Sequence, residues 1–220
     1  KLYFMLGLPT ETMDDIEGIA QLCKDVRENY YTLPREARTA PPHIGASAST
    51  FVPKPHTAFQ WEPQASVEQI MEKQRYLRDR MKMKYVDLAW HEPYTSVIEA
   101  AFSRGDRRLC AVLARAFELG CRFDGWSEYF SYEKWRKAFA DCCLTPEQYA
   151  CRRIDTDADL PWDHIFHGVS KSYLGREYRR ALAGQTTPDC RQGCQGCGLQ
   201  TRASVCKNMP GGENASHLQV

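Results

Sequence analysis

Two features that would place a chain in a broad class at once are missing from these 220 residues: an excess of one charge and a long apolar run. The 29 Lys and Arg residues balance 28 Asp and Glu residues, which leaves a net charge of +1. Such a charge supplies no field that draws a protein to nucleic acid. No apolar stretch approaches the roughly 20 residues of a membrane-spanning helix. We therefore expect one sizeable core and no membrane partner. Nucleic acid is disfavoured as a partner but not excluded.

Cysteine, by contrast, is abundant, with ten residues. Four of them gather near the end of the chain, at Cys190, Cys194, Cys197 and Cys206. The other six are scattered through helical patterns, where a thiol usually acts as a small buried hydrophobe. The sequence shows no secretory signal pattern, so this distribution favours a cytoplasmic protein with a metal site over a set of disulfides.

The opening of the chain predicts a strand, a tight turn and a helix. Leu2–Leu6 is a continuous apolar run, which is typical of a strand buried on both faces of a parallel sheet. Gly7 and Pro9 end the strand. Thr12 is the expected N-cap of a helix whose apolar positions recur at helical spacing from Ile16 onward. Ligands of α/β folds bind where such turns leave the carboxyl ends of the strands.

Two further strands, each followed by a helix, complete the expected pattern. Ile44–Val52 consists of small and β-prone residues, and Lys84–His91 alternates between apolar and polar residues. Capping-box spacings that begin at Ser66 (with Gln69) and at Ser96 predict the starts of the helices that follow. The predicted fold class is therefore α/β, with the first two strands parallel to each other.

Four segments carry a resemblance to a known family, one of them being the Ser96–Glu99 helix start followed by Arg104–Arg108, which resembles the subgroup described below. Phe4–Thr12 resembles the fifth strand and following turn of radical S-adenosylmethionine (SAM) enzymes, many of which have Gly where Thr10 stands. Phe51–Glu62 resembles the sixth-strand segment of one subgroup, whose members carry a cobalamin-binding-like domain ahead of the barrel. That subgroup typically has Pro where Ala58 stands. Trp162–Val169 resembles the same subgroup, and the first two segments occur in the family's order.

The resemblance implies a division into three parts. Residues 1–92 would supply the last strands of a partial (β/α) barrel, residues 93–184 a mostly helical extension, and residues 185–220 a Cys-rich, partly disordered tail. The family's primary cluster motif would lie upstream, so we expect the chain to be the carboxyl-terminal part of a longer protein. Its partner would be the upstream part of the same protein, and the chain alone would be inactive.

The resemblance also implies cofactors. Gly7, Pro9 and Glu11 would lie beside the adenine and methionine parts of SAM, and the backbone from Ser49 to Phe51 would flank the adenine. A 4Fe-4S cluster on upstream cysteines would reduce SAM to methionine and a 5′-deoxyadenosyl radical, which abstracts hydrogen from an unknown substrate. The upstream domain suggests methyl or related group transfer, and the residues of this chain leave open whether cobalamin is bound.

The cysteines near the end form a second candidate site. Cys190, Cys194, Cys197 and Cys206 are surrounded by glycines, which let a backbone wrap tightly enough for thiolates to converge on one metal ion. The spacing of the first three equals that of the family's primary cluster motif, but they follow the strands instead of preceding them. We therefore interpret them as ligands of zinc or of a second iron–sulfur cluster, with free thiols as the third alternative.

Isolated polar residues receive plainer interpretations. His56 lies in a Pro-rich loop, and His164 and His167 are spaced for one face of a turn. For all three, local hydrogen bonding is favoured over catalysis or metal ligation. Arg104 and the arginines that follow it are expected to form a solvated surface.

One alternative function belongs to another class of protein. The chain would then be a non-catalytic α/β scaffold whose zinc knuckle binds RNA or a protein partner. The near-zero net charge disfavours the RNA version. Metal content and visible absorption separate the two hypotheses, because iron–sulfur proteins are coloured and zinc proteins are not.

Overall fold

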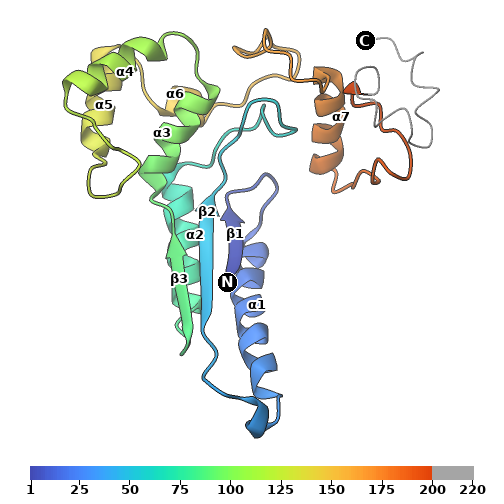
Figure 1. Ribbon diagram of the computed structural model, residues 1–220. Coiled ribbons are helices and arrows are strands. Elements are labelled where there is room, and N and C mark those ends of the chain that lie inside the picture. The colour runs from blue at the N-terminus through green and yellow to red at the C-terminus, as the bar shows by residue number, and fades with distance from the viewer. Residues whose placement is uncertain (200–220) are drawn as a thin grey trace. The chain divides into compact units, whose positions relative to one another are not determined.

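In a computed structural model that describes residues 1–199, three parallel strands form one sheet in the order β1-β2-β3 (Figure 1). The strands are β1 (Leu2–Leu6), β2 (Ile44–Thr50) and β3 (Val86–Trp90). Leu6 of β1 pairs with Thr50 of β2, and all the pairings are parallel. The predicted α/β class and the parallel pairing of the first two strands are confirmed. The described residues show this open sheet and no barrel.

Two helices cover one face of the sheet. They are α1 (Met13–Tyr31) and α2 (Val67–Arg80), and a short 3-10 helix, η1 (Arg35–Ala37), lies between α1 and β2. Alternate strand residues such as Leu6 and Ala46 pack against Ile16 of α1 and Leu77 of α2 in one apolar core. The hydrophobic effect thus fixes which side of each strand faces the helices.

The opposite face of the sheet is open, which corrects the expectation that Leu2–Leu6 is buried on both faces. Tyr3 is 75% exposed and Met5 is 43% exposed. They pair with Ser47 and Ser49 of β2, which are half-buried. The apolar run Leu2–Leu6 therefore did not indicate burial on both faces. Among the described residues, helices cover only one face of the sheet.

The caps explain where the first two of these helices begin. The side chain of Thr12 accepts the Asp15 amide, and Asp15 accepts the Thr12 amide, so the predicted N-cap is a full capping box. Ser66 forms the same motif at the start of α2. The predicted start at Ser96 is wrong, because α3 (Pro93–Arg104) begins three residues earlier, with a proline at its first position.

The next four helices after β3 build a second apolar core. They are α3 (Pro93–Arg104), α4 (Leu109–Glu118), α5 (Tyr132–Asp141) and α6 (Glu147–Ala150). Trp135 and Phe139 of α5 pack there against Val112 of α4. Among residues 1–199, no helix combines the length and the apolar character that crossing a membrane requires.

Arg104 is fully buried, at 0% exposure, which corrects the expectation of a solvated arginine. Its guanidinium donates to the main-chain carbonyls of Tyr149, Ala150 and Arg152 at 2.6, 2.8 and 2.7 Å. The carbonyls at the end of a helix lack intrahelical donors. Arg104 supplies those donors at the end of α6 and so ties α6 to α3.

The chain divides into two compact units, of which the first comprises Lys1–Val52 and Pro63–Arg152. The second comprises Pro53–Glu62 and the chain from Arg153 onward, including α7 (Lys171–Leu182). This division does not coincide with the expected domain boundaries after residues 92 and 184, which stay a prediction.

The second unit is held by a small core and a buried polar network. Trp61 packs with Trp162 and Tyr178. The carboxylate of Glu62 is buried and accepts hydrogen bonds from the Tyr178 hydroxyl at 2.5 Å and from Arg153 at 2.9 Å. Pairing of this kind is what makes a buried carboxylate tolerable.

Candidate functional site

The turn after β1, at the carboxyl edge of the sheet, is fixed by a hydrogen bond and an ion pair. Gly7 has φ +83° and Thr10 has φ +66°, both in the left-handed region. The Gly7 amide donates to Oε2 of Glu11 at 2.9 Å, and Lys73 of α2 forms an ion pair with the same oxygen. A non-Gly residue in the left-handed region is strained, so Thr10 has a backbone conformation that favours glycine.

The geometry at Gly7 changes the reason for a glycine there. A Cβ atom at Gly7 would lie 2.8 Å from Cδ1 of Ile70 and 3.3 Å from Cβ of Ala65. The space that the missing side chain leaves is therefore filled by α2 and the residues before it. The resemblance puts Gly7 beside SAM, and in the structure its missing side chain allows α2 to approach.

The segment after β2 lies beside this turn. The Phe51 amide donates to the Leu6 carbonyl at 2.8 Å, and the Ser49 hydroxyl donates to the Phe4 carbonyl at 3.2 Å. The buried amide of Gln64 donates to the Phe51 carbonyl at 3.1 Å. These bonds fix the backbone from Ser49 to Phe51 at the carboxyl end of β2.

The five residues expected beside SAM are thus brought to one edge of one sheet, at the ends of two paired strands. They are Gly7, Pro9, Glu11, Ser49 and Phe51. A hollow of about 490 Å³ at β1 is lined in part by Leu8, Pro9, Thr10 and Glu11. The contact of each residue with a cofactor stays a prediction.

The carboxylate of Glu11 has an internal role that the sequence did not suggest. Its side chain is 5% exposed, and Oε2 already serves both the Gly7 amide and the Lys73 ammonium. It therefore fixes the conformation of the turn by closing it onto α2. Any contribution of Glu11 to ligand binding at this edge would include that positioning.

The cysteines near the end are only partly within the described residues. Cys190 is exposed, Cys194 and Cys197 are half-buried, and Cys206 lies outside the described range. In residues 1–199 no three His, Cys, Asp or Glu side chains are grouped as a metal ion would need. Because one of the four ligands lies outside this range, the predicted metal site is untested by this geometry.

A grouping that the sequence did not predict lies in the second unit. The rings of His56 and His167 meet with their centroids 4.0 Å apart, in a hollow of about 440 Å³ that Asp163 also lines. His56 has φ +59°, and its amide donates to the buried Gln60 at 2.9 Å. The expected neighbour of His167 was His164, and the structure gives it His56 instead.

The electrostatics of this pair favour a neutral His56. Burial lowers the pKa of His56, the neighbouring His167 lowers it further, and Asp163 acts in the opposite direction. Asp163 is itself held by Lys171 at 2.6 Å. The two histidines are 111 positions apart, so no local spacing could have found them; the only signal was a histidine in a loop stiffened by Pro53 and Pro55.

Comparison with known proteins adds little about the activity. No family model matches the chain, and no solved structure matches it. A protein of Methanocaldococcus jannaschii that is described as uncharacterized is 30% identical over 115 residues. The match takes in 51% of this chain and 22% of that protein, so the chain spans about a fifth of the relative's length.

Proposed function

We propose that the chain is the carboxyl-terminal part of a radical SAM enzyme, and that the carboxyl ends of β1 and β2 form part of its SAM site. The observation that carries the proposal is the turn from Gly7 to Glu11. It ends one strand of a parallel sheet and begins a helix, and its backbone is left-handed at Thr10, where the resembling family commonly has glycine. The length of the relative is in keeping with a piece of a larger protein.

One hollow at this edge has the size of a small-molecule site, and it is lined by residues of β1, the following turn and α1, with none from β2. The hollow of about 490 Å³ falls within the range of about 300–1,000 Å³ that small-molecule sites occupy. Small side chains at Gly45, Ser47 and Ser49 leave the open face of β2 accessible to a flat ring. Both observations support the proposal without identifying the ligand.

When bound, SAM and an iron–sulfur cluster held upstream would supply a carbon radical that abstracts hydrogen from the substrate. The residues of this chain would hold and orient the cofactor. Glu11 would keep the turn closed, Pro9 would fix the direction of the chain past the strand, and the backbone from Ser49 to Phe51 would lie along the adenine. The substrate and the group transferred are not part of the proposal.

The test measures 5′-deoxyadenosine released from SAM, with a chemical reductant and a reconstituted cluster. We expect release by the longer protein that contains these residues and none by the 220-residue chain alone. Ser49→Leu, which fills the open face at the carboxyl end of β2, should reduce SAM binding by the longer protein. Asp87→Leu, on the same open face at the amino-terminal half of β3, is the matched control.

Two results would count against the proposal. Release of 5′-deoxyadenosine by the chain alone would mean that the primary cluster motif is not upstream. A longer protein that is colourless, contains zinc and leaves SAM intact would favour the non-catalytic scaffold with a zinc knuckle.

A further inference from the structure

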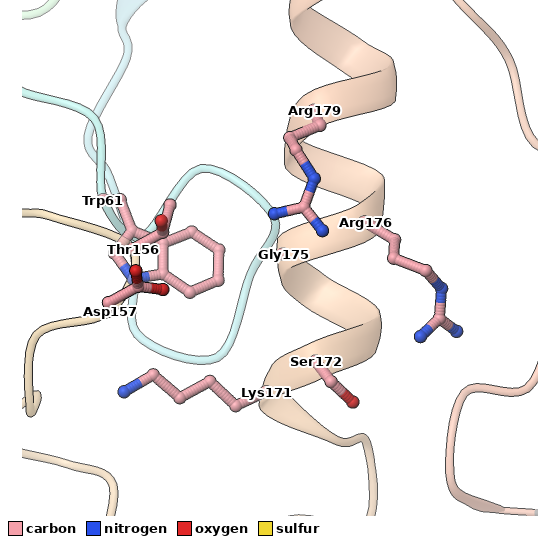
Figure 2. A pocket seen from close by; sticks show the side chains of 8 residues that line it. All are labelled: Trp61, Thr156, Asp157, Lys171, Ser172, Gly175, Arg176 and Arg179. Carbon is pink, nitrogen blue, oxygen red and sulfur yellow. The ribbon is translucent and has the colours of Figure 1, made fainter. Parts of the chain in front are cut away.

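The second unit contains a hollow of about 600 Å³ that the proposed SAM site does not involve (Figure 2). One wall is a face of α7, where Lys171, Gly175 and Arg179 follow one another at intervals of four residues. Residues spaced in this way share one side of a helix. Trp61 and Asp157 line the other side. The volume is that of a site for a small molecule.

Arg179 differs from the other cations of α7. Lys171 is held by Asp163, Arg176 donates to the carbonyls of Gln195 and Gly196, and Arg180 pairs with Glu177. The guanidinium of Arg179 has no hydrogen bond or ion pair with any residue in the described part of the chain. Figure 2 shows it extending toward the side on which Trp61 lies, whereas Arg176 extends away.

Gly175, which lies between Lys171 and Arg179 on α7, also indicates a binding site. Glycine is a poor residue for the interior of a helix, yet Gly175 is buried in the middle of α7. Packing does not require it, because a Cβ atom there would lie 3.8 Å from Arg179 and 4.0 Å from Trp61, which are ordinary contacts. What the missing side chain leaves is open space at the floor of the hollow.

The charges indicate the chemistry of a ligand. Arg179 supplies donors with positive charge on the helix wall, and the Lys171 ammonium has a third N–H beyond those that serve Asp163 and the Ala158 carbonyl. Thr156 and Ser172 also line the hollow. Phosphate groups, which carry several acceptor oxygens, are bound by such sets of donors. The carboxylate of Asp157 on the other wall would repel a phosphate and accept hydrogen bonds from hydroxyl groups.

We propose that this hollow binds a phosphorylated sugar compound, with its phosphate at Arg179 and Lys171 and its hydroxyl groups at Asp157. The ligand is either a free sugar phosphate or a nucleotide, which share this chemistry. The proposal is independent of SAM binding at the sheet edge. It depends only on residues of the second unit.

The experiment is calorimetric titration of the 220-residue chain with ribose 5-phosphate, adenosine 5′-monophosphate, inorganic phosphate and ribose. We expect saturable binding of one or both phosphorylated sugars and none of ribose. Arg179→Gln should weaken binding about tenfold or more, which is about 1.4 kcal/mol. Arg180→Gln removes the same charge from the same helix outside the hollow and should leave the affinity within about twofold.

Two more variants separate ligand binding from folding. Gly175→Ala should weaken binding while the melting temperature stays equal or rises, because alanine favours the helix and meets only ordinary contacts. Asp157→Asn should weaken binding of the phosphorylated sugars, whose hydroxyl groups lose their carboxylate acceptor, and should tighten binding of inorganic phosphate, because the repelling charge is gone. Preference for adenosine 5′-monophosphate over ribose 5-phosphate would identify the ligand as a nucleotide, and the reverse as a free sugar phosphate.

Three outcomes would overturn the proposal. These are no saturable binding of either phosphorylated sugar, an equal loss in Arg179→Gln and Arg180→Gln, and binding of the sugars no tighter than of inorganic phosphate. The last two would mean that the chain attracts anions without a built site.

Discussion

Replacing Arg104 with methionine tests how the helical part of the first unit is held together. Each hydrogen bond from a charged donor contributes roughly 1.5–3 kcal/mol, and Arg104 makes three of them to main-chain carbonyls. Burial of the guanidinium opposes this gain by several kcal/mol. Methionine fills the same space with an apolar chain of similar length and removes the guanidinium donors of the Tyr149 and Arg152 carbonyls, whereas the Ala150 carbonyl keeps the main-chain amide of Gln64 at 2.9 Å. We therefore expect Arg104→Met to lower the free energy of unfolding by about 3 kcal/mol.

The assay is urea unfolding followed by circular dichroism, combined with hydrogen exchange of the amides in α6. Exchange locates the loss, which matters because a chain with two units need not unfold in one step. Arg108→Met is the matched control, since its side chain is 62% exposed and paired with Asp106, and such pairs contribute about 0–1 kcal/mol. Arg104→Lys keeps the charge without the planar fork and should fall between the two.

A cost below about 1 kcal/mol for Arg104→Met would refute the reasoning, because that is the average for any substitution. Unchanged exchange in α6 would refute it as well. Either result would mean that water reaches the three carbonyls and replaces the guanidinium.

The remaining predictions concern the turn, the second unit and the cysteines. Gly7→Ala should lower the free energy of unfolding in urea by about 1–3 kcal/mol, since the left-handed backbone and the contact with α2 both oppose a side chain at Gly7. Gly18→Ala in α1 is the control and should raise it, because a Cβ atom there meets no other atom within 4 Å. Equal effects of the two substitutions would contradict this. Burial and the hydrogen bond to Glu62 raise the pKa of Tyr178 to about 12, so the folded state favours the neutral phenol. Relative to an unfolded pKa of about 10, this stability is present below about pH 10 and lost between about pH 10 and 12; Tyr178→Phe should remove that part of the pH dependence of thermal unfolding, and an unchanged profile would count against the network. Cys194→Ser should release one equivalent of metal from the purified chain and leave the helices folded, and a metal-free wild-type chain would end the hypothesis of a metal site.

Local patterns accounted for most of the first unit. Apolar runs and small residues predicted strands at Leu2–Leu6 and Ile44–Val52, because each run is short and ends at a glycine or a proline. The structure has the first with these bounds and ends the second two residues earlier, at Thr50. Thr12 and Ser66 marked helix starts correctly, since a capping box acts through residues that are three positions apart. Ser96 misled because a proline at position 93 provides an equally good start one turn earlier.

Long-range contacts were out of reach of the same reasoning. Arg104 looks like a surface residue in its sequence context, and only the return of the chain at Tyr149 buries it. His56 and His167 are brought together because Gln60 holds one loop and Trp162 holds the other, through a hydrogen bond between their side chains at 2.8 Å. Nothing in either local sequence specifies that pairing.

Glu11 has a role in the fold where the resemblance suggests a role in ligand binding. The resemblance puts its carboxylate beside a cofactor, while the structure uses it to bind the Gly7 amide and Lys73. The turn therefore keeps its shape through a buried ion pair, and the groups left to face a ligand are the backbone and the side chains of Leu8, Pro9 and Thr10. If SAM binds at this edge, as we propose, substitution of Lys73 should weaken binding, and substitution of Glu11 should weaken it more, because Glu11 also holds the Gly7 amide.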